Sequence, residues 1–275
     1  MNYDYVILDN IALDTINYKI NDHIQLFQTK KSNKTILLAY RDYVGFENNI
    51  ALFLRCLQIA IPKISIRLGS EYKPPKESMY EILKNSTGHV MNRYDSPSRD
   101  TVDYRSHTIN KEDLDSIKRT FEIVVSHNKN MILNEENEFK SNRWGYAYQQ
   151  YLTACAANTI QDSVLHLITG LETLLVKGSG LLTYKVALNA SLILEETEDK
   201  REKVFEVIKK MYNLRSKVVH GEVKEMSKQL AASSTYDNYY ELKCILSRIL
   251  VKIYNISEDK VFDRIKTIIF KSPKF

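Results

Sequence analysis

Apolar residues in the first part of the chain occur in short runs, rich in β-branched and aromatic side chains, that favour strands. These runs are residues 3–8, 23–28, 35–40 and 102–109. The Lys-, Ser- and Asn-rich stretch at 29–34 predicts a hairpin between the second and third of them. Residues 60–68 also alternate as a strand does, and Pro62 restricts that strand to a sheet edge or to its first residues. Residues 71–100 are broken by Pro and Gly, which indicates loops around a short helix near 77–84.

Helical periodicity is already present in this region. Residues 47–58 place apolar side chains at three- and four-residue spacing, which predicts a helix. Asn110 and Asp113 resemble an N-cap pair that opens a second helix, extending to about residue 127. The polar stretch at 128–141 then predicts a domain boundary.

After this boundary the helical period is nearly continuous. The predicted helices are residues 142–157, 159–176, 181–194, 200–220, 235–255 and 257–270. Short connections between amphipathic helices are typical of a helical bundle. The fold class predicted is therefore an α+β domain at residues 1–140 followed by an all-α bundle at residues 141–275.

Composition and charge narrow the function. The chain has 275 residues, 44% of them hydrophobic, and no apolar run approaches the ~18–20 residues of a membrane span. The acidic N-terminus at residues 1–10 does not suit a signal peptide, and the three isolated cysteines suit reduced thiols, so we expect a cytoplasmic protein. Residues 1–140 hold 19 Lys and Arg against 19 Asp and Glu, whereas residues 141–275 hold 20 against 15 and so carry the whole net charge of +5. A basic C-terminal half suits a polyanionic partner.

Histidine and cysteine spacings do not match a metal site. No His-Glu-x-x-His and no paired Cys-x-x-Cys occurs, and we expect neither a metal nor another cofactor. His166 lies in an apolar helical pattern, which favours a hydrogen-bonded core residue over a ligand. Gly178-Ser179-Gly180 lacks the Gly-Lys-Ser/Thr of a phosphate-binding loop and is interpreted as a helix linker.

The candidate chemistry lies at the end of the helix predicted for residues 200–220. Arg215 and His220 are separated by four residues there, and Gly221 follows as a predicted left-handed cap. An arginine can hold a phosphate through two parallel hydrogen bonds, and a histidine can move protons near neutral pH. Together they suffice for metal-free cleavage of RNA, whose phosphodiester has its own 2'-hydroxyl nucleophile.

The spacing also sets a geometric condition. His220 lies five positions after Arg215, which is about 140° around an ideal helix. The two side chains therefore converge only if the last turn loosens or if they meet across a partner chain. Lys217 adds a cation and Ser216 a hydroxyl. A purely structural role is the alternative, because basic side chains commonly complement the dipole at a helix C-terminus.

The string from Tyr212 to Gly221 resembles the RX4–6H signature of HEPN domains, in the ApeA-like branch. Two further segments are similar to that family in the same order: the helix around Ile168-Thr-Gly-Leu-Glu172-Thr-Leu-Leu resembles its "ALEALL" helix, and Leu182-Thr-Tyr-Lys-Val-Ala-Leu resembles its "LSYRLAL" segment. The resemblance covers only the C-terminal half. Glu172 falls on a recurrent acidic position of the family, either in the cleft or paired with a buried cation.

This resemblance implies a helical bundle that dimerises and a metal-independent endoribonuclease. Arg215 would bind the scissile phosphate and His220 would act as general acid or base, in a cleft between protomers, with Ser216, Lys217 and Glu172 in support. Attack by the 2'-oxygen would leave a 2',3'-cyclic phosphate. The implied partner is RNA, tRNA included, with a neutralising or trigger partner in antiphage defence or a toxin or stress role. The alternatives are a non-catalytic HEPN dimer that binds nucleic acid or protein and, as a third class, a helical scaffold.

Overall fold

A computed structural model describes residues 3–8, 11–15, 17–21, 24–28, 35–40, 49–64, 107–133 and 143–271. The chain divides into two compact units, Met1–Ser126 and His127–Phe275. A small strand region comes first and a helix-rich part follows, as the sequence predicts at this coarse level. The predicted boundary at residues 140/141 lies outside the described residues. Helix α3 (Lys111–Leu133) extends beyond its predicted end at about residue 127 and includes residues 128–133 of the polar stretch.

The first unit contains a four-stranded antiparallel sheet in the order β1-β5-β4-β3. Its strands are β1 (Tyr3–Leu8), β3 (Asn17–Lys19), β4 (Ile24–Gln28) and β5 (Thr35–Tyr40). A separate parallel pair joins β2 (Ile11–Leu13) to β6 (His107–Ile109). The three predicted strands within residues 3–40 and the β4–β5 pairing are confirmed, and β6 confirms the end of the run at 102–109. The predicted turn at 29–34 and the loops at 71–100 lie outside the described residues.

Helix α1 (Asn49–Ala60) packs on β1 and β5 through fully buried Phe53, Cys56 and Leu57. It continues to Ala60, and residues 61–64 form turns, so the strand predicted for residues 60–68 is wrong over 60–64; residues 65–68 lie outside the described residues. The buried Ile59 and Ile61 belong to a helix end, whose apolar residues imitate strand alternation over so short a run. The predicted N-cap pair of α3 is confirmed: the backbone N–H of Asp113 donates to the Asn110 side chain at 3.0 Å, and that of Asn110 to the Asp113 carboxylate at 3.2 Å.

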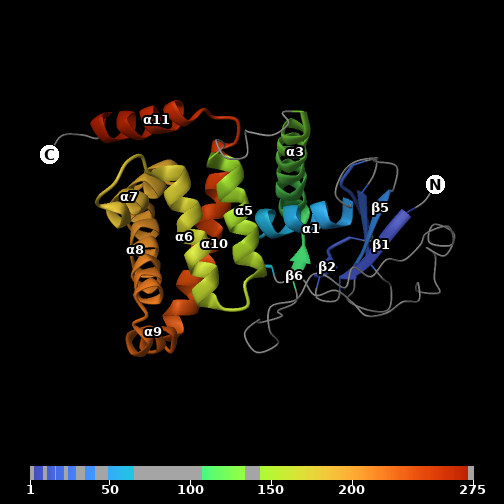
Figure 1. Ribbon diagram of the computed structural model, residues 1–275. Coiled ribbons are helices and arrows are strands. Elements are labelled where there is room, and N and C mark those ends of the chain that lie inside the picture. The colour runs from blue at the N-terminus through green and yellow to red at the C-terminus, as the bar shows by residue number, and fades with distance from the viewer. Residues whose placement is uncertain are drawn as a thin grey trace. The chain divides into compact units, whose positions relative to one another are not determined.

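The second unit is a bundle in which α6 and α10 contact several neighbours each. The helices described within residues 143–271 are α5 (Arg143–Ala156), α6 (Ile160–Leu175), α7 (Leu182–Leu194), α8 (Glu198–His220), α9 (Val223–Leu230), α10 (Ser233–Ile253) and α11 (Glu258–Lys271). Six of them match the predicted helices, and α9 was not predicted. Figure 1 shows α5, α6, α8 and α10 side by side, with α11 across one end and α9 at the other.

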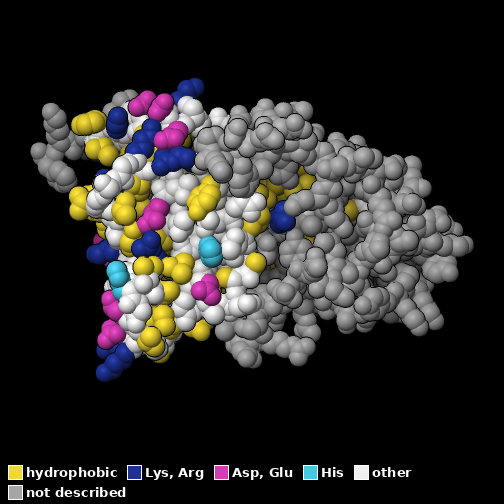
Figure 2. Space-filling model, in the orientation of Figure 1, with side chains coloured by type: hydrophobic (Ala, Val, Ile, Leu, Met, Phe, Trp, Pro, Cys, Tyr) yellow, Lys and Arg dark blue, Asp and Glu magenta, His cyan; other side chains and the backbone are white. Residues whose placement is uncertain are grey.

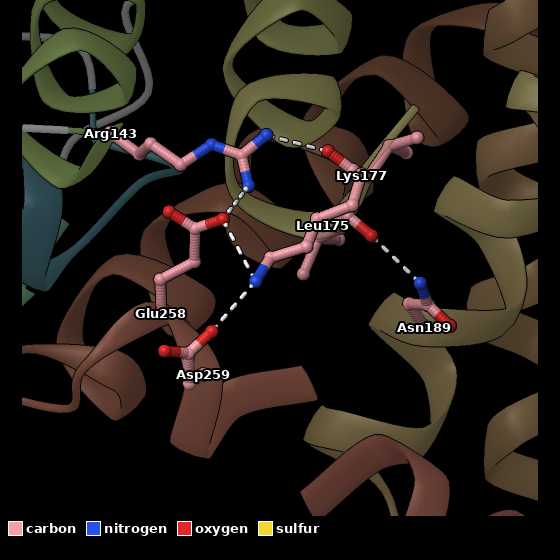
Figure 3. Close-up of polar contacts among 7 residues, drawn as sticks. Arg143, Leu175, Lys177, Asn189, Glu258 and Asp259 are labelled. Atoms are coloured by element: carbon pink, nitrogen blue, oxygen red, sulfur yellow. Dashed lines mark hydrogen bonds and ion pairs between the residues drawn. The ribbon is translucent and has the colours of Figure 1, made fainter. Parts of the chain in front are cut away.

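The end of α6 is fixed by side chains from its neighbours (Figure 3). Its last carbonyls have no partners within the helix; Asn189 donates to the Leu175 carbonyl at 2.7 Å and Arg143 to that of Val176 at 2.6 Å. Arg143 also contacts Glu258 at 2.9 Å, and Lys177 reaches Glu258 and Asp259 at 3.2 and 2.9 Å. This cluster attaches the first turn of α11 to the end of α6, and the hydrogen bond from Lys177 lowers the pKa of Asp259.

Gly170 places α6 close to two other helices. A Cβ atom at this position would lie 2.9 Å from Leu246 Cδ2 and 3.4 Å from the Ala147 carbonyl oxygen. The Leu246 side chain can move, but the backbone of α5 cannot move without shifting the whole helix. Gly170 therefore sets the spacing between α6 and its neighbours.

We expect Gly170→Leu to destabilise the helical unit by about 1–3 kcal/mol, because overpacking a filled core costs roughly this much. Gly170→Ala is the matched control and should cost less, since alanine gains helix propensity. Urea unfolding followed by Trp144 fluorescence measures both, because this single tryptophan lies in α5 and donates to the Leu250 carbonyl of α10. Wild-type stability in Gly170→Leu would show that the helices separate without cost.

Candidate functional site

The Arg–His element lies in the last two turns of α8. The apolar side of this helix forms part of the core through Val204, Ile208, Met211, Tyr212 and Leu214. Arg215, Ser216 and Lys217 are half-buried, whereas His220 is exposed. The sequence period thus places the arginine at the margin of the core and the histidine in solvent.

Gly221 ends α8 in the left-handed conformation, as predicted, with φ of 68°. Its N–H donates to the Val218 carbonyl at 3.3 Å, and the N–H of Glu222 donates to the Lys217 carbonyl at 2.9 Å. These two bonds form a Schellman motif, which satisfies carbonyls at the helix end. The helix remains regular through His220, so the last turn does not loosen and the two site residues stay on different sides of it.

Arg215 has a cation–π contact and an unusual buried atom. Its Cζ atom lies 5.6 Å from the centroid of the Tyr212 ring, one turn earlier. Its Nε atom is buried and has no hydrogen-bond partner among the residues that the structure describes. Within the same residues no carboxylate forms an ion pair with its guanidinium. A buried donor without a partner is rare in folded proteins, which makes this group a candidate for binding an anion.

Glu172 contacts Tyr212 rather than Arg215. The Tyr212 hydroxyl donates to Glu172 Oε1, which links α8 to α6. Burial, followed by this hydrogen bond and the charge of Glu172, raises the pKa of Tyr212 to about 12, while Arg215 and the Thr183 side chain lower it. The predicted supporting residue therefore lies beside Arg215 but is joined to it through a tyrosine.

Lys217 is held by α9. Its Nζ donates to Gln229 Oε1 at 2.8 Å, and Gln229 Nε2 donates to the Lys210 carbonyl at 3.2 Å. One amide thus ties α9 along the last turns of α8. Ser216 and His220 have no side-chain hydrogen bond within the described ranges, so the imidazole of His220 is open to solvent or to a ligand.

Two exposed apolar side chains flank His220 and Gly221 at this end of α8, and two others lie at the start of α7. Val219 and Val223, on either side of His220 and Gly221, are 53% and 64% exposed. Leu181 and Tyr184, at the start of α7, are 76% and 53% exposed. Tyr184 packs edge-on against Phe205 of α8, with 5.8 Å between the ring centroids, and so lies further back along this helix. The apolar surface at the end of α8 therefore borders the histidine.

Sequence reasoning placed five residues in the site, and the structure brings only some of them together. Glu172 and Arg215 share Tyr212 as a neighbour, while Lys217 is bound to α9 and His220 points elsewhere around the helix. Tyr212 and Gln229 were not assigned a role. Tyr212 stands within the string that resembles the family, so its position was available as a signal, whereas Gln229 belongs to a helix that the sequence did not reveal.

Comparisons with protein-family models, with curated proteins and with solved structures found no match to this chain. Within the described ranges, no group of three or more His, Cys, Asp or Glu side chains is placed to hold a metal ion. No helix in the part of the chain that the structure describes is both long and apolar enough to cross a membrane. His166 contacts Gln150 Oε1 at 2.7 Å, as predicted for a hydrogen-bonded residue, but it is half-buried and not in the core as expected.

We expect Gly221→Ala to destabilise the helical unit by about 1–2 kcal/mol, because a side chain with Cβ is strained in the left-handed region. Nothing lies within 4 Å of the added Cβ, so the cost is conformational rather than steric. Gly221→Asn should cost less, since asparagine adopts this conformation more readily. Urea unfolding compares the two variants with the wild type. Equal stability of all three proteins would contradict the left-handed conformation of residue 221 at the end of α8.

The raised pKa of Tyr212 predicts a loss of stability in alkali. The unfolded chain releases this proton near pH 10 and the folded chain near pH 12, so the stabilisation is complete below about pH 10 and disappears by about pH 12. The free energy of unfolding of the wild type should therefore fall relative to that of Tyr212→Phe across this window. Urea unfolding of both proteins at several pH values tests this. If the difference between their free energies of unfolding does not change with pH, the pKa of Tyr212 is not raised by folding.

Proposed function

We propose that this protein is a metal-independent endoribonuclease of HEPN type that works as a dimer. The observation that carries the proposal is Arg215, whose buried Nε lacks a partner and whose guanidinium forms no ion pair among the described residues. Five positions later, His220 is exposed at the C-terminal end of the same helix. The resemblance of the surrounding string to the HEPN signature supports the same reading.

The chemistry needs one cation at the phosphate and one group that moves protons. The 2'-oxygen forms a bond to phosphorus, and the bond from phosphorus to the 5'-oxygen breaks. The 2'-hydroxyl proton is removed by a base, and the leaving 5'-oxygen receives one from an acid. Arg215 would stabilise the charge that develops on the phosphoryl oxygens, and His220 would act as the acid or the base. The products are a 2',3'-cyclic phosphate and a 5'-hydroxyl.

The regular end of α8 supports a dimer. Because Arg215 and His220 lie about 140° apart on one straight helix, a single chain does not present them to the same phosphate. A second copy would bring the partner subunit's His220 towards Arg215. The exposed Val219 and Val223 provide apolar area beside His220 for such an interface. Ser216 would lie next to the arginine, and Lys217 would remain a structural link to α9.

Charge on the helical part fits a moderate attraction for RNA. Residues 141–275 carry 20 Lys and Arg against 15 Asp and Glu. Figure 2 shows basic and acidic side chains mixed on the face it displays, so attraction there is not concentrated in one broad basic patch. We therefore expect specificity to come from the Arg215 site more than from general electrostatics. The substrate proposed is cytoplasmic RNA, tRNA included, in antiphage defence or a toxin or stress role with a trigger or neutralising partner. Residues 1–140 would sense the trigger or choose the substrate.

We expect the purified protein to cleave total RNA or a tRNA pool in EDTA and to leave 2',3'-cyclic phosphate ends. Arg215→Ala and His220→Ala should each lower the rate by roughly a hundredfold or more, the usual contribution of such groups. Lys209→Ala is the matched control, because it removes an exposed cation from the same helix, paired with Glu206 at 3.3 Å. The fragments and their ends are resolved on denaturing gels.

Cleavage that survives both substitutions would contradict the proposed site. Intact RNA, bound with an affinity that falls steeply as salt rises, would instead favour the non-catalytic binding module, because phosphate contacts release counterions. If the protein neither binds nor cleaves RNA, the helical scaffold would be the remaining one of the three functional classes.

A further inference from the structure

Tyr212 lies between two opposite charges and contacts each in a different way. Its hydroxyl donates to the Glu172 carboxylate of α6. Its ring lies under the guanidinium of Arg215, with the Cζ atom 5.6 Å from the ring centroid. The residue itself is only 8% exposed, so both contacts are held in place by packing.

One side chain thus contacts both charged groups, the carboxylate through its hydroxyl and the guanidinium through its ring. The charge of Glu172 raises the pKa of Tyr212, and the charge of Arg215 lowers it. A carboxylate and a guanidinium that meet directly can form a bidentate ion pair. Here they do not: the Glu172 oxygen accepts from the tyrosine, and the buried Nε of Arg215 remains without a partner within the described residues.

We propose that Tyr212 is a positioning residue that keeps Glu172 away from Arg215, so that the guanidinium remains available for a phosphate of the RNA backbone. This inference rests on the proposed function and adds to it separate roles for Tyr212 and Glu172. The ring supports the guanidinium from below, while the hydroxyl satisfies the carboxylate that would otherwise neutralise it. Glu172 is thus a structural anchor for Tyr212 and not a group that touches RNA.

The hydroxyl and the ring of Tyr212 have different roles in this proposal. The substitution Tyr212→Phe removes only the hydroxyl and keeps the ring. Glu172 then loses its donor, and Arg215, on the other side of the Tyr212 contact, has an N–H without a partner within the described residues. Once the two pair, the guanidinium has to be released before it binds phosphate. Tyr212→Phe/Glu172→Gln removes the competing charge as well, so the guanidinium is available again.

The test measures affinity for a fluorescently labelled RNA with 2'-O-methyl riboses, which binds but offers no nucleophile. Tyr212→Phe should weaken binding roughly tenfold, the size of one hydrogen bond to a charged group. Glu172→Gln should bind at least as tightly as the wild type, and the double variant should return to wild-type affinity. With cleavable RNA, the rise in KM of Tyr212→Phe should exceed the fall in kcat.

A spectroscopic measurement separates positioning from simple destabilisation. In ¹⁵N spectra without RNA, the Arg215 Nε–H resonance, assigned by its loss in Arg215→Ala, should shift and exchange more slowly in Tyr212→Phe. That change should be absent from the double variant. Melting followed by Trp144 fluorescence confirms that every variant is folded at the temperature of the assay.

The outcomes distinguish this inference from the function beneath it. If Arg215→Ala keeps wild-type affinity and cleavage, the proposed function is wrong. If Arg215→Ala loses both while Tyr212→Phe matches the wild type, the function stands and the positioning role is overturned. If Tyr212→Phe loses affinity and the double variant does not recover it, Tyr212 acts through packing alone, and the inference is equally overturned.

Discussion

The close approach of α6 to its neighbours sets the geometry of the helical unit. Gly170 lets α6 pass within contact of the α5 backbone and of Leu246 in α10. Side chains from α5 and α7 then close the carbonyl end of the same helix, through Arg143 and Asn189. Glu172 lies between these two restraints, so its position is set by backbone spacing and capping rather than by its own flexible side chain. The Tyr212 contact, and with it the orientation of Arg215, depends on this placement.

The sequence alone was sufficient to predict local structure where a residue type strongly favours one conformation or one hydrogen-bonding pattern. Gly221 was predicted as a left-handed cap because few other residues adopt that conformation cheaply, and its φ of 68° agrees. Asn110 and Asp113 were predicted as a cap pair and form reciprocal hydrogen bonds. The long helices of the second unit followed from periodicity, because burial of one side of a helix repeats every three to four residues.

The sequence was insufficient where a neighbour decides the outcome. The run at residues 60–68 alternates as a strand does, yet α1 continues to Ala60, with its apolar face packed on β1 and β5, and turns follow at 61–64. Helix α9 has only eight residues and none of them is buried, so its apolar repeat at Val223, Met226 and Leu230 is too short to predict a helix by itself. A hydrogen bond between Lys217 and Gln229 holds it on α8. In the site, the residue types were predictable, but their pairing was not. The sequence placed Glu172 and Arg215 in one region and could not reveal that a tyrosine stands between them.

The attachment of α11 differs in kind from the rest of the bundle. Its first turn is fastened by exposed ion pairs from Arg143 and Lys177 to Glu258 and Asp259, and two apolar residues, Val261 and Ile265, are buried beneath it. Surface ion pairs weaken as dissolved salt screens them, whereas burial of apolar surface does not. The bundle therefore has a core that is insensitive to ionic strength and a terminal helix whose hold on that core varies with the ions around it.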